Sequence, residues 1–294
     1  MTGRSLHDAL LRVLTSAELR RRLAAGDDAV AGRLGGAEAA ALRAADPDRL
    51  ARLARFMGRH FYRERLVRLF AASRALARAR GTEPLGILAG GAFGALLDAA
   101  ELGSATTAEG VARLVEDVLR AALAGLAYGG DLVAYEGALF RAEAGPRRWR
   151  DGDGREDGRA VRSPHARLCA LEWDVTGLVV AVRRGDAAPP EPPRAPTRLL
   201  VALAPNGRVT TVRCPEAVER LLAALDGVRS TAEAAAAAGV GEAEAARVLR
   251  QLGEVGAVEW RSPGPSDQPG AGAHRAAPPQ TPPPRAVPGS STGP

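Results

Sequence analysis

The sequence predicts a mainly α-helical protein with a smaller α+β domain toward its C-terminal end. Apolar residues recur at helical spacing through most of residues 1–145, whereas β-type runs occur only after residue 165. Hydrophobic residues make up 46% of the 294 residues, which is enough for two ordinary domains. Aromatic residues make up only 4%. We therefore expect helix-rich cores built mainly from Ala, Leu and Val.

Residues 1–145 are predicted to form one helical domain without strands. Two capping boxes, Thr15 with Glu18 and Thr106 with Glu109, indicate where helices begin. The apolar register shifts near Gly58, which predicts a kink or break there. Helices are expected at Leu6–Leu14, Thr15–Leu23, Ala37–Ala45, Pro47–Arg80, Phe93–Leu102, Thr106–Leu126 and Asp131–Glu143.

The character of the chain changes after Gly145. Residues 146–163 are polar and Gly-rich, which predicts an exposed linker. Residues 164–262 are expected to form the second domain. Its elements are β-type runs at Ala166–Val175 and Arg198–Ala204, a returning strand at Arg208–Arg213, helices at Pro215–Leu225, Thr231–Ala238 and Glu242–Leu252, and a strand at Ala257–Trp260.

A hairpin, three helices and a final strand, in this order, form the skeleton of a winged helix. The predicted fold is therefore an N-terminal helical bundle followed by a winged-helix-like domain. Residues 263–294 contain mainly Pro, Gly, Ser and Ala, which cannot build a core and predict a disordered tail.

The net charge of +6 and the pI of about 10.4 suggest nucleic-acid binding. However, all 40 basic residues are Arg, and many of them alternate with acidic residues along the predicted helices. This pattern favours codon bias and solvated helix faces over a nucleic-acid surface. No secretory signal or membrane-spanning run is recognisable, and Cys169 and Cys214 are the only cysteines. We expect a cytoplasmic protein with free thiols and no membrane contact.

No residue constellation predicts catalysis. The four histidines, His7, His60, His165 and His274, are dispersed and lack partners at metal-ligand spacing. Neither cysteine has an adjacent histidine, and the Gly-rich run 88–94 lacks the Lys-Ser/Thr of a phosphate-binding loop. We therefore expect a binding protein rather than an enzyme, with no catalytic residue, metal ligand or cofactor in this chain.

The second domain contains a helix at Leu221–Leu225, an Asp226-Gly227 turn and a helix start at Thr231. Val248-Leu249, Leu252 and Gly256–Trp260 follow. This pattern resembles the family of small precursor-peptide recognition domains typified by the pyrroloquinoline-quinone biosynthesis chaperone. The resemblance implies that a leader peptide binds as an added strand on a sheet edge, beside the third helix. The predicted peptide-binding residues are Arg208, Val209, Thr210, Thr211, Val212 and Arg213 on the edge, with Arg247, Leu249 and Arg250 flanking it.

A second resemblance covers residues 45–260. It rests on Tyr62-Arg63 through Phe70, Gly94–Leu97, Asp131–Glu136, Ser163–Leu168 and Trp173–Val175. These segments resemble, in the same order, the partner proteins of multinuclear non-haem iron-dependent oxidative enzymes in ribosomal-peptide biosynthesis. The resemblance implies that the helical domain docks the enzyme. The residues expected to do so are Tyr62, Arg63, Tyr135, Glu136, Trp173 and Asp174.

The sequence thus predicts a non-catalytic partner subunit that presents a ribosomally made precursor peptide to an iron enzyme, in a heterodimer whose iron is held by the other subunit. The alternative is a winged-helix transcriptional regulator. The matching helical domain has been described as DNA-binding by analogy, which keeps that alternative open. The helix at 242–252 carries only Arg247 and Arg250 against Glu242 and Glu244, a balance poorly suited to phosphate contacts. Peptide binding is therefore favoured over DNA binding.

Overall fold

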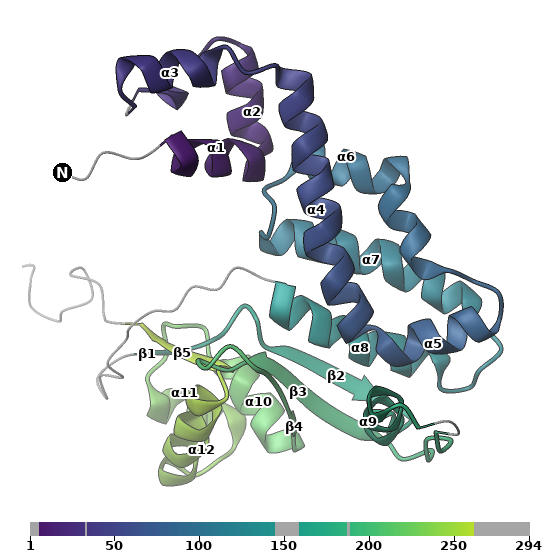
Figure 1. The fold of residues 1–294 in the computed structure, drawn as a ribbon. Coiled ribbons are helices and arrows are strands. Elements are labelled where there is room, and N and C mark those ends of the chain that lie inside the picture. Colours follow the sequence, from purple (N-terminus) through teal and green to yellow (C-terminus); the bar gives the residue numbers. More distant parts are fainter. Residues whose placement is uncertain (1–5, 33, 145–158, 187–188, 262–294) are drawn as a thin grey trace, which may run out of the picture.

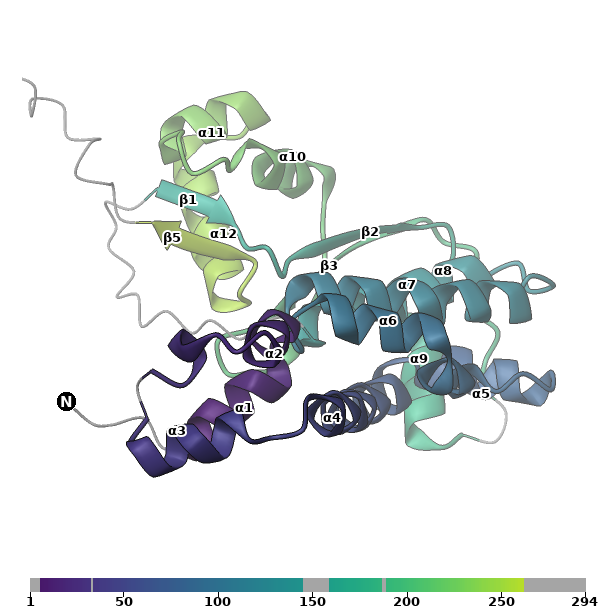
Figure 2. The ribbon, with the colours of Figure 1, turned by 90° about the horizontal axis from the view of Figure 1, so that it is seen from above.

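The computed structural model describes residues 6–32, 34–144, 159–186 and 189–261. Residues 146–158 of the predicted linker and the predicted tail at 263–294 lie outside these ranges. The described chain is mainly helical, with a small sheet region in its C-terminal part, as predicted (Figure 1). Helices of the N-terminal half lie on one side of the sheet, and the last three helices lie on the other (Figure 2).

The N-terminal half holds eight α-helices and two short 3₁₀ helices within its described residues. They are α1 (Leu6–Thr15), α2 (Ala17–Ala24), η1 (Asp28–Val30), α3 (Gly36–Arg43), α4 (Pro47–Leu69), α5 (Ala71–Ala79), η2 (Pro84–Ala89), α6 (Gly91–Ala99), α7 (Ala105–Ala122) and α8 (Gly129–Ala144). One small core joins α1, α2 and α3 to the beginning of α4 through side chains such as Val13, Leu23, Leu42 and Leu50. The largest core lies among α4 to α8 and contains Tyr62, Phe70, Phe93 and Phe140.

The predicted break at Gly58 is wrong, because α4 runs through it and ends at Leu69. Gly58 instead serves close packing: a Cβ atom there would lie 2.5 Å from Leu97 Cδ1 of α6. The chain turns at Phe70, whose backbone leaves the helical region (φ −99°, ψ 41°), and α5 begins immediately afterwards. Gly58 thus allows α6 to approach α4 closely without interrupting the helix.

The predicted capping boxes at Thr15 and Thr106 are wrong, because each helix is capped by a serine one or two residues earlier or later. Ser16, not Thr15, caps α2 by accepting a hydrogen bond from Leu19 N. Ser104 caps α7 by accepting one from Thr107 N. In each case a serine hydroxyl reaches the third backbone N–H of the helix, which is the usual N-cap geometry.

A three-stranded antiparallel sheet has the order β2-β3-β4, with β2 at Arg167–Leu171, β3 at Thr197–Leu203 and β4 at Val209–Arg213. The predicted turn at Pro205-Asn206-Gly207 connects β3 to β4, and Gly207 adopts a positive φ of 81°. The central strand β3 is almost entirely buried. Burial on both faces explains why its sequence is a continuous apolar run rather than an alternating one.

The two faces of β3 belong to different cores. Leu199 and Val201 pack in the large core with α8, whereas Leu200 and Ala202 pack with α10 (Glu216–Ala224), α11 (Thr231–Ala238) and α12 (Glu242–Glu254). Because successive side chains of a strand point to opposite faces, the sheet is enclosed between the two groups of helices. The large core therefore includes residues from both sides of the predicted 146–163 linker.

Two elements differ from the prediction in this half. The end of the predicted linker, Arg159–Arg162, forms strand β1, which pairs with β5 (Val258–Arg261). Residues Thr176–Arg184 form helix α9, which packs on α5, where no helix was expected. The predicted order of hairpin, three helices and strand is present. The last strand, however, pairs with β1 and not with the hairpin.

Candidate functional site

The outer edge of β4 is the candidate site, because β3 pairs with only one side of this strand. Among the strands in the described part of the chain, none pairs with the other side of β4. The N–H group of Ala204 donates to Arg208 O, and that of Cys214 donates to Arg198 O, both at 2.9 Å. These two bonds fix which residues of β4 face β3.

Hydrogen-bonded and non-hydrogen-bonded pairs alternate along an antiparallel ladder. In the observed register, Thr210 and Val212 therefore direct their backbone groups toward β3. Val209, Thr211 and Arg213 direct their N–H and C=O groups away from it. Every second residue of β4 thus offers a backbone donor and acceptor, as a strand added by another chain would require.

Side chains on one face of β4 are fixed by the helical half. The Thr211 hydroxyl lies 3.2 Å from the Tyr135 hydroxyl of α8. The Arg213 guanidinium donates to Asp174 Oδ2 at 3.0 Å, and Val209 packs against the large core. A hydrogen bond from Thr176, together with Arg213, keeps the pKa of Asp174 below its usual value. These contacts hold the edge in an extended conformation before any partner binds.

The predicted flank on α12 is only partly exposed. Arg247 and Arg250 are exposed, but Leu249 is completely buried in the core beneath the sheet. A peptide cannot contact Leu249 in this conformation, so its assignment to the binding surface is wrong. The main contacts of α12 are with α11 and β5 rather than with β4. The edge of β4 therefore carries the candidate site without direct help from this helix.

Most residues predicted to dock an enzyme hold the chain together internally. Tyr62 and Glu136 have no exposed surface, and Tyr135 is only 7% exposed. Trp173 is half-buried, with its ring 6.2 Å from that of Tyr128. The docking assignment is therefore wrong for Tyr62 and Glu136.

Asp174 makes the internal contacts described above, so only Arg63 of the predicted docking set is freely exposed. Aromatic and charged residue types did not reveal that these side chains are buried.

Glu136 has a structural role that the sequence did not reveal. Its carboxylate accepts hydrogen bonds from Ala72 N and Ser73 N, both at 2.9 Å, at the first turn of α5. Unpaired N–H groups and the helix dipole make this terminus favourable for a negative charge. Complete burial nevertheless raises the pKa of Glu136 to about 7. The available sequence signal was a single acidic residue within an otherwise apolar stretch, Leu132–Phe140.

A partly buried ionic network joins α7 to α8. Arg141 donates to Glu109 Oε2 at 2.7 Å and also pairs with Glu116, which in turn accepts from Arg120 at 2.9 Å. Gly137 makes room for this network, because a Cβ atom there would lie 1.9 Å from Glu116 Oε1. Both glutamates are paired with arginine, so the network is typical of a structural contact.

Burial also raises the pKa of the Cys169 thiol to about 11, which disfavours the reactive thiolate. Among the described residues, no three His, Cys, Asp or Glu side chains gather where they could hold a metal ion. None of the described helices has the length and hydropathy needed to cross a bilayer. Comparison with protein-family models and with curated proteins gives no match for this chain.

Proposed function

We propose that this protein is a non-catalytic partner subunit that binds a precursor peptide by adding the peptide as a strand to β4. The observation that carries the proposal is the alternating set of outward backbone groups at Val209, Thr211 and Arg213. Backbone hydrogen bonds supply affinity in this mode of recognition, and pockets for alternate side chains supply specificity.

The surroundings of β4 favour this role. Its side chains are already positioned by Tyr135 and Asp174, so binding does not require the strand to be ordered first. Ordering a free segment would subtract from the affinity. A bound peptide would lie between the α8–α9 side and the α10 side of the sheet. Its other residues would then extend along the protein surface toward a catalytic partner.

The proposed partner is a multinuclear non-haem iron oxidative enzyme, and this part rests on the sequence resemblance described above. This chain would contribute effective concentration and orientation of the peptide, while the iron ligands would come from the other subunit. No residue of this chain is assigned to bond making or breaking. The exposed Arg63 is the member of the predicted docking set that remains available for enzyme contact.

Amide hydrogen exchange tests the edge directly. Peptides selected from a random display library for binding to the full chain serve as the probe, and exchange is followed by NMR. Bound peptide should protect the amides of Val209, Thr211 and Arg213, whereas Thr210 and Val212 should be protected with or without it. Protection confined to other elements, or no selectable binder, would contradict the proposal.

Proline substitution provides the matched mutational test. Thr211→Pro removes an N–H group that points away from β3, so no hydrogen bond to β3 is lost. Proline is tolerated at the edge of a sheet for this reason. We expect it to weaken binding of the selected peptide by about tenfold or more. Val209→Pro should act in the same way.

The control for the proline test is Thr211→Ala, which keeps the N–H group and should bind much more tightly than the proline variant. Equal affinities for Thr211→Pro and Thr211→Ala, in folded proteins, would overturn the assignment of the edge. A gel-shift screen with duplex DNA distinguishes the regulator alternative, which requires binding that decreases steeply with salt.

A further inference from the structure

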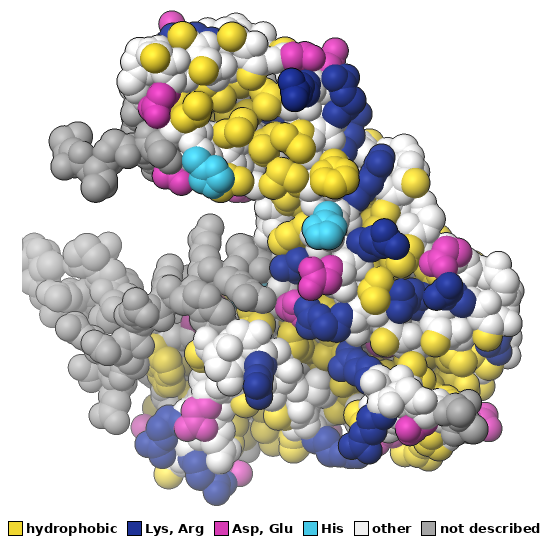
Figure 3. Space-filling view, viewed as in Figure 1, with side chains coloured by type: hydrophobic (Ala, Val, Ile, Leu, Met, Phe, Trp, Pro, Cys, Tyr) yellow, Lys and Arg dark blue, Asp and Glu magenta, His cyan; other side chains and the backbone are white. Residues whose placement is uncertain are grey.

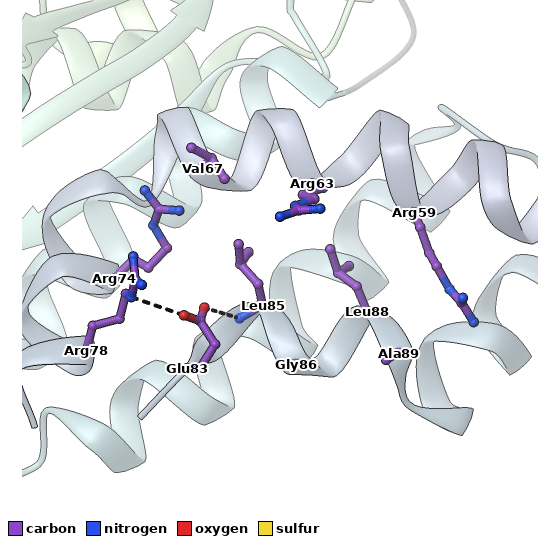
Figure 4. A pocket seen from close by; sticks show the side chains of 10 residues that line it. All are labelled: Arg59, Arg63, Val67, Arg74, Arg78, Glu83, Leu85, Gly86, Leu88 and Ala89. Atoms are coloured by element: carbon purple, nitrogen blue, oxygen red, sulfur yellow. Dashed lines mark hydrogen bonds and ion pairs between the residues drawn. The ribbon is translucent and has the colours of Figure 1, made fainter. Parts of the chain in front are cut away.

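A hollow of about 530 Å³ lies between α4, α5 and the 3₁₀ helix η2 (Figure 4). This volume is within the range of about 300–1,000 Å³ typical of ligand sites. The hollow is on elements other than β4, so its interpretation does not rest on peptide binding at that strand, although it includes Arg63, which was proposed above for enzyme contact. Its lining residues are Arg59, Arg63, Val67, Arg74, Arg78, Glu83, Leu85, Gly86, Leu88 and Ala89.

The walls of the hollow carry four arginines and one acidic residue. Arg59 and Arg63 are four residues apart on α4, and Arg74 and Arg78 are four apart on α5, so each pair shares a helix face. Glu83 pairs with Arg78 at 3.0 Å. In the part of the chain that the structure describes, Arg59, Arg63 and Arg74 form no ion pair. These three guanidinium groups are therefore available to pair with an anionic ligand.

The space between the arginines is apolar. Val67 of α4 faces Leu85 of η2, and Leu88, further along η2, lines the hollow near Arg63 and is only 5% exposed. Basic side chains also gather along the exposed face of α4 in the space-filling view (Figure 3). A ligand that fits both features must therefore combine negative charge with an apolar group.

The arginines are spread along the hollow rather than gathered at one point. Arg74 and Arg78 lie at one end, Arg63 is central and Arg59 lies at the other end (Figure 4). Arg59 and Arg63 are about 6 Å apart along the α4 axis, and Arg74 lies on a different helix. A phosphate held at one end of the hollow would leave the arginine at the other end without an anion, whereas an extended ligand with several anionic groups can pair with arginines at both ends.

We propose that this hollow binds a short acidic segment of another polypeptide, in which apolar side chains are flanked on both sides by carboxylates. The apolar side chains occupy the space between Val67 and Leu85. The flanking carboxylates pair with Arg59 and Arg63 on one side and with Arg74 on the other. Arginine suits this role because its planar guanidinium forms two parallel hydrogen bonds to a carboxylate.

The test uses the full chain and a fluorescein-labelled peptide, Glu-Glu-Leu-Leu-Glu-Glu, with binding followed by fluorescence anisotropy. The groove variant combines Arg59→Glu and Arg63→Glu. The control combines Arg49→Glu and Arg52→Glu, which makes the same change of charge on the same helix but outside the hollow. We expect about a tenfold or greater loss of affinity in the groove variant and less than about a twofold loss in the control.

Three further probes separate the alternatives. A peptide in which serine replaces both leucines should bind more weakly, and Leu85→Ser should reduce affinity for the leucine peptide alone. Inorganic pyrophosphate should compete poorly, because it lacks the apolar group. Circular dichroism establishes that each variant is folded.

Four results would overturn the proposal. They are the absence of peptide binding to the parent chain, equal losses in the groove and control variants, equal binding of the serine peptide, and displacement by pyrophosphate at concentrations comparable to those of unlabelled peptide. The last result would assign the hollow to a small anion instead.

Discussion

The buried carboxyl group of Glu136 should make the stability of the protein depend on pH. Burial raises its pKa from 4.5 to about 7, so the folded state binds this proton more tightly than the unfolded state does. The resulting stabilisation is fully present below about pH 4.5 and is lost as the pH rises through about 7. The two pKa values differ by about 2.5, and each unit corresponds to about 1.4 kcal/mol, so the loss is about 3 kcal/mol.

Replacement of Glu136 by glutamine isolates this contribution, because glutamine has a similar size and stays neutral at every pH. Below about pH 4.5 the variant and the parent should have similar free energies of unfolding. At about pH 8 the variant should be more stable, by up to about 3 kcal/mol. Urea denaturation at a series of pH values between about 4.5 and 8 gives the free energy of unfolding of each protein. Contributions from the other titrating groups are the same in both proteins, so they cancel in the difference.

Glu136→Ala serves as the control for the two hydrogen bonds. It leaves the Ala72 and Ser73 N–H groups without their acceptor, which should cost about 1–3 kcal/mol for each group at every pH. Parallel stability curves for the parent and Glu136→Gln would refute the reasoning. So would a glutamine variant that is less stable than the parent at about pH 8, since that result would mean that the hydrogen bonds outweigh burial.

Two other substitutions test contacts of α8. Gly137→Ala should lower the free energy of unfolding by about 1–3 kcal/mol in urea denaturation, because the added Cβ would lie 1.9 Å from Glu116 Oε1. Gly130→Ala on the same helix has open space around it, and an equal loss there would argue against crowding. Tyr135→Phe should cost about 1 kcal/mol by removing the hydrogen bond to Thr211. A double-mutant cycle with Thr211→Val should show coupling, and strictly additive effects would indicate that the two hydroxyls do not interact.

Local signals predicted much of the fold. The observed α11 has the predicted bounds, Thr231–Ala238, and the Pro205-Asn206-Gly207 turn correctly placed the β3–β4 hairpin. Helix α9 was missed because Leu178, Val179, Val180 and Val182 form an apolar run rich in β-branched residues, which is also typical of strands. Strand β1 was missed because its partner β5 is about 100 residues away in the sequence, as the pairing of Arg159 with Arg261 shows.

Less of the candidate site was predictable. Hairpin periodicity identified the strand Arg208–Arg213, and its place at an edge follows from the observed strand order. Burial was not predictable from residue type, so Leu249 was placed on the binding surface although it lies in the core. Tyr62 and Glu136 were misassigned for the same reason. The arginine-lined hollow brings together segments from residues 59 to 89, whose relative placement depends on the turn at Phe70.

Because the three-stranded sheet is enclosed between two groups of helices, dividing the chain into fragments would expose its core. A fragment beginning near residue 159 would lose α8 and would present Leu171, Leu199 and Val201 to water, although none of them is more than 4% exposed in the whole chain. A contiguous exposed apolar surface of this kind promotes self-association. The N-terminal fragment would expose the complementary surface of α8. Affinities measured on either fragment would therefore include nonspecific association through surfaces that are buried in the whole chain. Binding studies should use the full-length chain.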